Sequence, residues 1–350
     1  MSGKTARYSA GVNKRGPTLE DVAREAGVSR ATVSRVVNGI RNVDPVIQDV
    51  VRQAIRATGY TPNGAARSLV TRRAETVALL VSGAGDGFAA RVFADPFFGR
   101  IVSGAVTYLR GRAMHPVLMF AESDAAREQV VDYLRRGSAD GALVVSIQAD
   151  DPLPQMLVDA RVPAVLFARP PHPLPVSYVD MDHYRGGRLA AEHLLARGCR
   201  YPAAISAPQD LPAGRDRLAG FRDALARAGR GPAPVAEGRF TLDSGAAAMI
   251  RLLEGHPGTD GVFVANDLMA QGACQILREQ GRRVPDDVAV VGFDDSTIAV
   301  TCRPPLTTVR QPVEKMAAAM AELLAGHLQG AGNGPTRVLF DPELVVRESA

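Results

Sequence analysis

Residues Thr18–Asn38 read TLEDVAREAGVSRATVSRVVN and carry the signals for two short helices joined by a tight turn. Thr18 can cap the first helix, and Asp21, three residues later, faces the same exposed amides and the positive end of the helix dipole. The apolar residues of this helix recur at helical spacing and form one buried face: Leu19, Val22, Ala23 and Ala26. The sequence therefore predicts an amphipathic helix that starts directly after Thr18.

The second helix follows Gly27, which permits the turn, and Ser29, which can cap the new N-terminus. Its inward face is apolar: Val33, Val36 and Val37. Its outward face is basic, small or polar: Arg30, Ala31, Ser34 and Arg35. The spacing of Ala23, Gly27 and Val33 is that of a helix-turn-helix, the unit that inserts its second helix into DNA. An ordinary helical hairpin at a protein surface is the alternative.

A third helix is predicted over Pro45–Thr58, with Asp44 as its cap and Pro45 at its first position. Its apolar residues are predicted to close the small core: Val46, Ile47, Val50, Val51 and Ile55. The following segment, Gly64–Val70, is too short to be stable as an isolated helix.

Charge separates this N-terminal head from the rest of the chain. Residues 1–74 carry 13 Lys or Arg against 5 Asp or Glu, whereas residues 75–350 carry 28 against 32. A basic head on an acidic body is typical of a protein whose head binds a polyanion such as DNA.

Composition narrows the function classes. A chain of 350 residues has room for a DNA-binding module and a two-lobed body. No apolar run reaches the roughly 20 residues of a membrane helix, and residues 1–17 lack the apolar stretch of a signal peptide, so a cytoplasmic location is expected. Three cysteines without CxxC spacing (Cys199, Cys274 and Cys302) predict buried, unreactive thiols, and no metal or cofactor is expected.

From Glu75 onward, short β-rich runs alternate with amphipathic segments. The predicted strands are Thr76–Val81, Pro116–Phe120, Gly141–Val145, Ala164–Ala168, Tyr178–Asp180, Ala203–Ser206, Gly261–Val264 and Val288–Gly292. The predicted helices are Phe97–Arg112, Asp124–Gly137, Arg185–Arg197, Arg215–Ala228, Ser244–Glu254, Leu268–Gln280 and Val313–Gln329. This alternation indicates an α/β body of two doubly wound parallel-sheet lobes, with a ligand cleft at the carboxyl ends of the strands.

The runs DVAREAGVSRATVSRVVN and GYTPNGAARSLVTRR resemble the headpiece and hinge of the LacI/GalR (lac repressor) family, nearly continuously over residues 18–82. The resemblance implies that the helix Arg30–Asn38 enters the major groove and that Arg30, Ala31 and Arg35 read bases. An arginine can donate two hydrogen bonds to guanine, whereas Ala31 offers only apolar contact. The phosphate-binding positions it implies are Thr18, Ser29, Thr32, Ser34 and Asn38.

In the hinge, Leu69 matches the leucine that this family wedges into the minor groove, and Ala66 permits close approach of the two hinge helices. Leu69 as a cap on the headpiece core is the alternative. Because so short a helix should not persist alone, residues 63–70 are predicted to become ordered only on DNA.

The body carries further runs that resemble the family and the periplasmic sugar-binding proteins: DPFFGRIVSGA (95–105), VFVANDLMAQGA (262–273), VPDDVAVVGFDD (284–295) and PPLTTVRQP (304–312). The effector residues that the resemblance implies are Phe97 and Phe98 on the first lobe, and Arg217, Phe240, Asn266 and Asp294 on the second. Carboxylate, amide and guanidinium groups beside an aromatic face suit a sugar or related polyol.

Each effector candidate also has a purely structural interpretation. Asp294 and Asn266 could cap helices or turns, and the two phenylalanines could belong to the core. Arg217 could form a salt bridge between lobes. The segment Ser82–Ala94 is longer than the family's usual link and could build an extra wall or admit an oligosaccharide, and the sequence Ala168-Arg169-Pro170 lacks an acid found in some relatives.

The domain organisation that follows is a basic, disordered tail, a headpiece, a hinge and a two-lobed body. The predicted boundaries are 1–17, 18–62, 63–74 and 75–350, with lobe 1 at about 75–176 and 308–333 and lobe 2 at about 177–305 and 335–350. No heptad tail follows the final LVVRES strand, so a homodimer on a near-palindromic operator is expected.

The predicted function is that of a sequence-specific DNA-binding transcriptional regulator, a repressor controlled by a small effector, with no role for a membrane. A sugar-binding sensor without a DNA role is the second class, against which Arg30, Arg35 and the hinge argue. An enzyme is the third, and no GxSxG, HExxH, dinucleotide or P-loop motif supports it, so no catalytic residue is assigned.

Overall fold

The computed structural model describes residues 16–38, 43–61, 73–85, 87–330 and 334–350. The chain divides into two compact units, Met1–Ala74 and Glu75–Ala350. Nearly all of the predicted basic tail lies outside the described residues. The predicted hinge helix lies outside them as well, including Ala66 and Leu69.

The N-terminal unit contains three helices, α1 (Leu19–Ala26), α2 (Arg30–Val37) and α3 (Pro45–Thr58), among its described residues. Thr18 and Asp21 form a reciprocal capping box at the start of α1. Gly27 ends the helix with a φ of 63°, in the left-handed region that glycine adopts without strain. The Ser29 side chain then caps α2 by accepting a hydrogen bond from the Thr32 amide.

The headpiece core is smaller than the sequence predicts. Its buried residues are Val22, Ala26, Val33, Val51 and Ala54. The prediction that Val46 and Val50 close this core is wrong, since they are 71% and 40% exposed, and Ile47 is 36% exposed. At 3.6 residues per turn, the buried face of α3 is set by Val51 and Ala54, and Val46 and Val50 point about 140° and 100° away from Val51.

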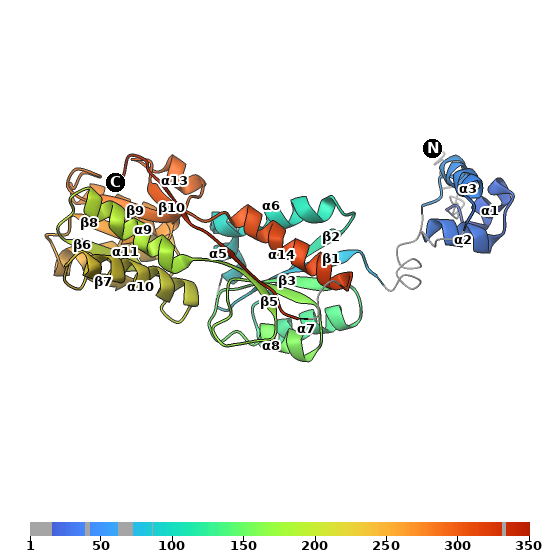
Figure 1. Cartoon of the computed structure of the whole chain (residues 1–350), viewed down its shortest axis with the longest axis horizontal. Helices are drawn as coiled ribbons and strands as arrows, with labels where there is room; N and C mark the ends of the chain where they lie inside the picture. Colours follow the sequence, from blue (N-terminus) through green and yellow to red (C-terminus); the bar gives the residue numbers. More distant parts are fainter. Residues whose placement is uncertain (1–15, 39–42, 62–72, 86, 331–333) are drawn as a thin grey trace, which may run out of the picture. The chain divides into compact units, whose positions relative to one another are not determined.

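The C-terminal unit contains two six-stranded sheets (Figure 1). The strand order of the first sheet is β11-β5-β4-β3-β1-β2, and all of its pairs are parallel. Its strands are β1 (Thr76–Ser82), β2 (His115–Ala121), β3 (Gly141–Ser146), β4 (Ala164–Phe167), β5 (Ser177–Met181) and β11 (Arg337–Phe340).

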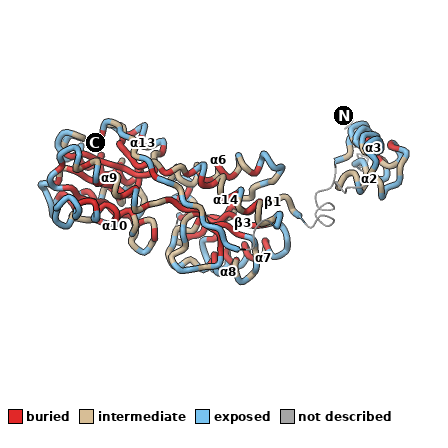
Figure 2. The backbone as a smooth tube through the Cα atoms, viewed as in Figure 1, coloured by how far each residue is buried: buried red, intermediate tan, exposed pale blue. Residues whose placement is uncertain are grey.

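The second sheet has the order β12-β10-β9-β8-β6-β7. Its strands are β6 (Pro202–Ser206), β7 (Val235–Glu237), β8 (Gly261–Val264), β9 (Ala289–Asp294), β10 (Thr307–Arg310) and β12 (Glu343–Val345). Its pairs are parallel except that β12 runs antiparallel to β10 at one edge. Figure 2 shows that the central strands of both sheets are buried along their length, as expected where helices cover both faces.

Helices separate consecutive strands except between β4 and β5 and between β11 and β12, and this alternation confirms the α/β fold predicted from the sequence. The first lobe carries α5 (Phe88–Ala94), α6 (Pro96–Arg110), α7 (Asp124–Arg135), α8 (Leu153–Asp159) and α14 (Val313–Leu328). The second carries α9 (His183–Ala196), α10 (Pro212–Arg227), α11 (Leu242–Gly255), α12 (Asp267–Glu279) and α13 (Thr297–Thr301).

The chain crosses between the sheets in three places: after β5, after β10 and after β11. The predicted lobe boundaries need correction here, because residues 177–181 and 337–340 pair in the first sheet and residues 307–310 pair in the second. The short strand β10, which reads TTVR, was not predicted. Its polar Thr307 and Thr308 are fully buried, and each donates a hydroxyl hydrogen bond inside the second lobe.

Helices α6 and α14 lie side by side on the first sheet (Figure 1). Gly104 of α6 allows this approach, because a methyl group at its Cα would overlap the main chain of Glu314 at the start of α14. Gly99, one turn earlier in the same helix, has open space at that position.

We predict that Gly104→Ala destabilises the body by about 1–3 kcal/mol through overpacking. Gly99→Ala is the matched control and should be neutral or stabilising by about 0.5–1 kcal/mol, because alanine restricts the unfolded chain. Denaturant unfolding of both variants measures the two changes. Equal stability of the two variants would show that the α6–α14 contact is looser than described.

Candidate DNA-binding and effector sites

Helix α2 exposes the residues predicted to read bases. Three of its residues lie on the solvent side: Arg30, Ala31 and Arg35. Val33, on the opposite face of the same helix, is fully buried. The guanidinium of Arg30 pairs with Glu20 of α1 at 3.0 Å, and no ion pair holds Arg35 within the described part of the headpiece. The arrangement presents two arginines on one exposed helix, the geometry that a major-groove reader needs.

The hydroxyl and amide groups predicted to bind phosphate are held in place by local contacts. The hydroxyls of Ser29 and Thr32 lie 2.9 Å apart, and the Asn38 side-chain amide donates to the Ser34 hydroxyl at 3.2 Å. Thr18 donates its hydroxyl to Asp21 at 2.8 Å. These contacts place the polar groups around the two ends of α2 and the start of α1.

The predicted effector residues of the second lobe lie at the carboxyl ends of its strands. Asp294 is the last residue of β9, and Asn266 follows β8 by two positions. Phe240 follows β7, with a left-handed φ of 61°. Arg217 comes from α10 and reaches the main chain directly after β8. Ligands bind at this edge in doubly wound sheets, so the four positions fit the predicted cleft.

Arg217 is 5% exposed, and each of its three guanidinium nitrogens donates one hydrogen bond. Its guanidinium lies 3.7 Å from the ring centre of Phe293 and donates to the Ala265 carbonyl at 2.5 Å, to Gln311 Oε1 at 3.1 Å and to His183 Nδ1 at 3.2 Å. Burial lowers the pKa of this arginine. Arg217 could have formed a salt bridge between the lobes, but it makes none: its three hydrogen-bond acceptors are uncharged when His183 is neutral.

His183 has a lowered pKa, first because it is buried and second because Arg217 is positively charged. Its Nδ1 accepts from Arg217, so its Nε2–H is the nitrogen that faces Asp180 Oδ1, at 3.2 Å. Since Asp180 lies next to the last residue of β5 in the first sheet and His183 starts α9, this contact spans the first crossing. Sequence analysis did not identify His183, Asp180 or Gln311, because nothing in their local pattern distinguishes them from ordinary loop and cap residues.

Both ends of the Asn266 side-chain amide make a hydrogen bond within the protein. Its Oδ1 accepts from the Met269 amide and caps α12, and its Nδ2 donates to the Phe240 carbonyl at 3.3 Å. The helix-capping interpretation is thus borne out in the structure. A second consequence is that Asn266 fixes Phe240, whose ring packs beside the core of the second lobe.

Asp294 differs from the other candidates because its carboxylate makes no hydrogen bond within the described chain, although the residue is only 7% exposed. Burial raises its pKa well above the usual value, and the charge of Arg217 opposes this rise. The nearby carboxylates of Asp267 and Asp95 raise the pKa further. A buried carboxylate without hydrogen-bond donors is an acceptor ready for a ligand.

The first lobe contributes aromatic side chains from the start of α6. Asp95 caps the helix, and Phe97 and Phe98 follow in its first turn, both half-buried. The Phe97 ring lies 5.4 Å from that of Phe98 and 5.3 Å from that of Phe167, both edge-on. They are therefore part core and part surface. Arg100, in the next turn of α6, donates to the Asp294 carbonyl at 2.8 Å, so the start of this helix lies against the end of β9.

The unusually long link after β1 forms the short helix α5. Phe88 and Val92 of α5 are buried in a small cluster with Val81, at the carboxyl ends of β1 and its neighbours. The buried Arg127 donates to the Gly83 carbonyl at 3.0 Å, which anchors the start of the link. The link is therefore packed onto the end of the first sheet.

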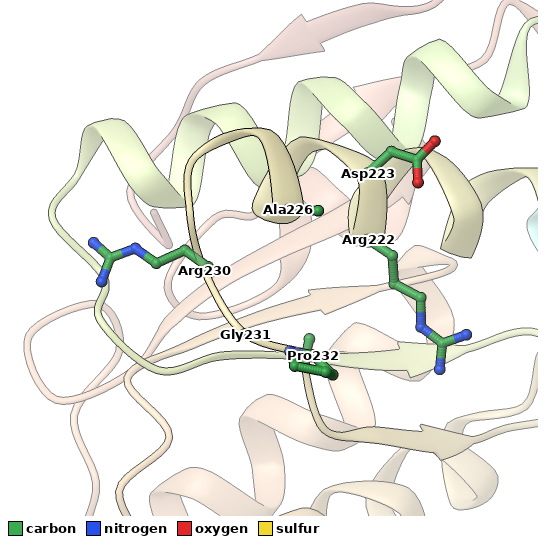
Figure 3. Close-up of a pocket in the computed structure, with 7 residues that line it drawn as sticks. Arg222, Asp223, Ala226, Arg230, Gly231 and Pro232 are labelled. Carbon is green, nitrogen blue, oxygen red and sulfur yellow. The ribbon is translucent and has the colours of Figure 1, made fainter.

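A separate hollow of about 420 Å³ lies at the other end of the second lobe, between the end of α10 and the loop before β7 (Figure 3). It contains none of the predicted effector residues. Its lining residues are Arg222, Asp223, Ala226, Arg230, Gly231, Pro232 and Ala233.

Two expectations from composition can be compared with the structure. All three cysteines are buried free thiols, as predicted. No helix within the described ranges is both long enough and apolar enough to span a membrane.

Comparison with known proteins matches residues 18–63 to a model described as bacterial regulatory proteins of the lacI family, and residues 191–350 to a periplasmic binding protein-like domain. The chain is 48% identical over 341 residues to the HTH-type transcriptional regulator CelR of Thermobifida fusca, an alignment that covers 96% of this chain and 99% of that protein. The chain belongs to the LacI family. The family and the fold class predicted from the sequence are confirmed.

Two solved structures of this LacI family cover nearly the whole chain. A complex of the transcriptional regulator CelR with cellobiose superimposes with a TM-score of 0.75 at 46% identity, covering 95% of this chain and all of that one. The lac repressor dimer bound to operator and the anti-inducer ONPF gives a TM-score of 0.79 at 28% identity, covering 96% and 99%. The chain is accordingly a sequence-specific transcriptional regulator.

We predict that Asp294→Asn raises the melting temperature of the body at pH 8 by about 2–4 °C, which corresponds to roughly 1 kcal/mol. A carboxyl with a folded-state pKa above its unfolded value destabilises the fold increasingly as pH rises above the unfolded pKa, and in full above the folded pKa. The gain should therefore shrink as pH falls toward about 4, near the ordinary carboxyl pKa. Scanning calorimetry between pH 4 and pH 8 measures this difference.

Asp267→Asn is the matched control. Burial raises the pKa of Asp267 to about 6, but its carboxylate accepts from the Ser296 amide at 2.8 Å and from the Thr308 hydroxyl at 2.6 Å. Losing these bonds should lower the melting temperature at every pH. If the melting temperature of Asp294→Asn at pH 8 is lower than that of wild type, Asp294 is instead the required counter-ion of Arg217.

Proposed function

We propose that this LacI-family regulator is a homodimeric repressor that binds a near-palindromic operator and is controlled by a sugar held between the two lobes of its body. The observation that carries the effector half is the carboxylate of Asp294, a largely buried residue, which accepts no hydrogen bond from the described chain and lies near Arg217 and the aromatic start of α6. Vicinal hydroxyls of a sugar would supply the hydrogen bonds that this carboxylate lacks.

For the DNA half, we propose that Arg30 and Arg35 donate to base edges and that Ala31 makes apolar contact, with Thr18, Ser29, Thr32, Ser34 and Asn38 on phosphates. The exposure of α2 and the local bonds that orient these hydroxyls support this assignment. Ala66 and Leu69 are proposed to bind the minor groove. A chromosomal target implies a cytoplasmic location, and regulation by binding requires no catalytic residue.

We further propose that the effector is a disaccharide of the cellobiose class. The relative with 46% identity was solved as a cellobiose complex, and the packed link with α5 adds material at the carboxyl edge of the first sheet, where a longer ligand would extend. The second lobe then holds one sugar unit through Asp294, and Phe97 and Phe98 cover an apolar sugar face.

The proposal predicts two separable losses of function. Arg35→Ala should weaken preference for operator over random duplex by roughly 10- to 100-fold, the worth of one arginine–guanine pair, while sugar affinity stays unchanged. Asp294→Ala should keep operator binding and lose the response to sugar. Gel shifts with and without sugar measure both, and loss of both activities in both variants would contradict a modular regulator.

Sugar class is tested by thermal shift. Cellobiose at a concentration 100-fold above its Kd should stabilise the folded protein by about 2.7 kcal/mol, whereas glucose at the same concentration should do much less. The Asp294→Ala variant should show no shift with either sugar. Equal shifts with glucose and cellobiose would favour a monosaccharide effector.

A sensor without a DNA role is the competing function. It predicts that duplex binding is weak and independent of sequence at physiological salt. A regulator predicts salt-dependent binding with a preferred site, because Lys and Arg contacts to phosphate release counterions.

A further inference from the structure

We propose that Arg100 is a positioning residue for the effector site, because it is the side chain through which the first lobe holds the main chain of Asp294 on the second lobe. The inference deepens the proposed function and rests on it. Arg100 lies in α6, one turn after Phe97. Its side chain is only 17% exposed.

The guanidinium of Arg100 contacts three different elements at once. Its Nη1 donates to the Asp294 carbonyl at 2.8 Å, and its Nη2 donates to the Gln311 carbonyl at 3.0 Å. Its Nε and Nη2 also donate to the two carboxylate oxygens of Glu314, at 2.7 and 2.9 Å. The side chain therefore links α6 and α14 of the first lobe to β9 of the second lobe and to the crossing after β10.

The first-lobe end of this link is rigid. Arg100 and Gly104 are four residues apart and share one face of α6. Gly104 brings that face against the main chain of Glu314, and the bidentate ion pair with Glu314 then fixes the plane of the guanidinium. Of the three remaining N–H groups, two donate to the carbonyls of Asp294 and Gln311, and their direction is set by the fixed guanidinium plane.

The second-lobe end is strained. Asp294 has a φ of 111° and Asp295 a φ of 52°, a conformation that side-chain-bearing residues seldom adopt. Apart from Arg100, the one further bond that the Asp294 carbonyl accepts from the described residues is a long bond from the Gln311 amide, at 3.4 Å. Asp295 is secured from the second lobe by Arg310 and Arg347, at 2.7 and 2.6 Å. The hydrogen bond from Arg100 is thus the shorter of the two bonds to the Asp294 carbonyl, and it stabilises Asp294 in this conformation.

An effector that touches Asp294 and Phe97 together requires the lobes in the arrangement described, and Arg100 stabilises the same arrangement. The link between Arg169 and Asp216 also joins the lobes, but those side chains are 45% and 37% exposed, and such pairs contribute little. Removing Arg100 should therefore bias the protein away from the arrangement that binds effector.

The test compares Arg100→Gln with wild type and with Arg185→Gln in the full-length protein. Arg185 is the matched control because it makes an ion pair with Asp341 at 2.6 Å near the third crossing and does not contact Asp294. Cellobiose affinity is measured by titration calorimetry, and operator affinity by gel shift with and without cellobiose. Melting temperature is followed in parallel, and Arg100→Lys tests for partial rescue.

We expect Arg100→Gln to weaken cellobiose binding about 10-fold, the effect of losing charged hydrogen bonds to two carbonyls. Its operator affinity without sugar should move in the direction opposite to the shift that cellobiose causes in wild type. Arg185→Gln should match wild type, and Arg100→Lys, which keeps the charge, should lie between. A merely structural role would lower sugar affinity, operator affinity and melting temperature together.

Two further results would overturn the inference. If Arg100→Gln binds sugar with wild-type affinity and its operator binding responds to sugar as in wild type, the inference about Arg100 is refuted. The proposed function would still stand. A wild-type protein that binds no operator, or that ignores the sugars tested, would refute the proposed function and this inference with it.

Discussion

The buried guanidinium of Arg217 organises the carboxyl edge of the second lobe. It connects the end of β8, the start of α9 and the crossing after β10 through Ala265, His183 and Gln311, and it stacks on Phe293. A charged group that is removed from water must be compensated by hydrogen bonds and nearby polar groups, or the fold would be strongly destabilised. The elements around it can therefore differ little in position, and this rigidity defines the surface that a ligand meets.

Under the proposed function, effector binding at this edge depends on a carboxylate that accepts no hydrogen bond from the described chain. Asp294 is buried beside Arg217, carries a raised pKa and has a strained main chain, each of which lowers the stability of the effector-free protein. Such local costs persist where a binding partner removes them. Asp267 is buried nearby, but its oxygens accept hydrogen bonds from Ser296 and Thr308, so its carboxylate supports the fold, whereas we propose that the Asp294 carboxylate binds a ligand.

The headpiece could be predicted well from short sequence patterns, whereas contacts between residues far apart in the sequence could be predicted less well. Thr18 and Gly27 act through neighbours three or four residues away, so their roles could be predicted from spacing alone. Val46 was assigned to the core because apolar residues usually are, but the position of the buried face of α3 depends on where α1 lies. The same reason explains the misplaced lobe boundaries, since residues 307–310 pair with β9 and β12 through hydrogen bonds that no local pattern records.

By itself, the sequence determined the helix-turn-helix, the alternation of strands and helices, the family and the identity of most candidate site residues. Periodicity, caps and motif spacing are properties of neighbouring residues, which is why these features can be read without a fold. Only the tertiary structure decided that Asn266 is committed to capping, that Asp294 is left without a donor and that Arg100 reaches it from the other lobe. Arg100 and Asp294 are 194 residues apart in the chain, and their contact exists only because three crossings bring the edges of two sheets together.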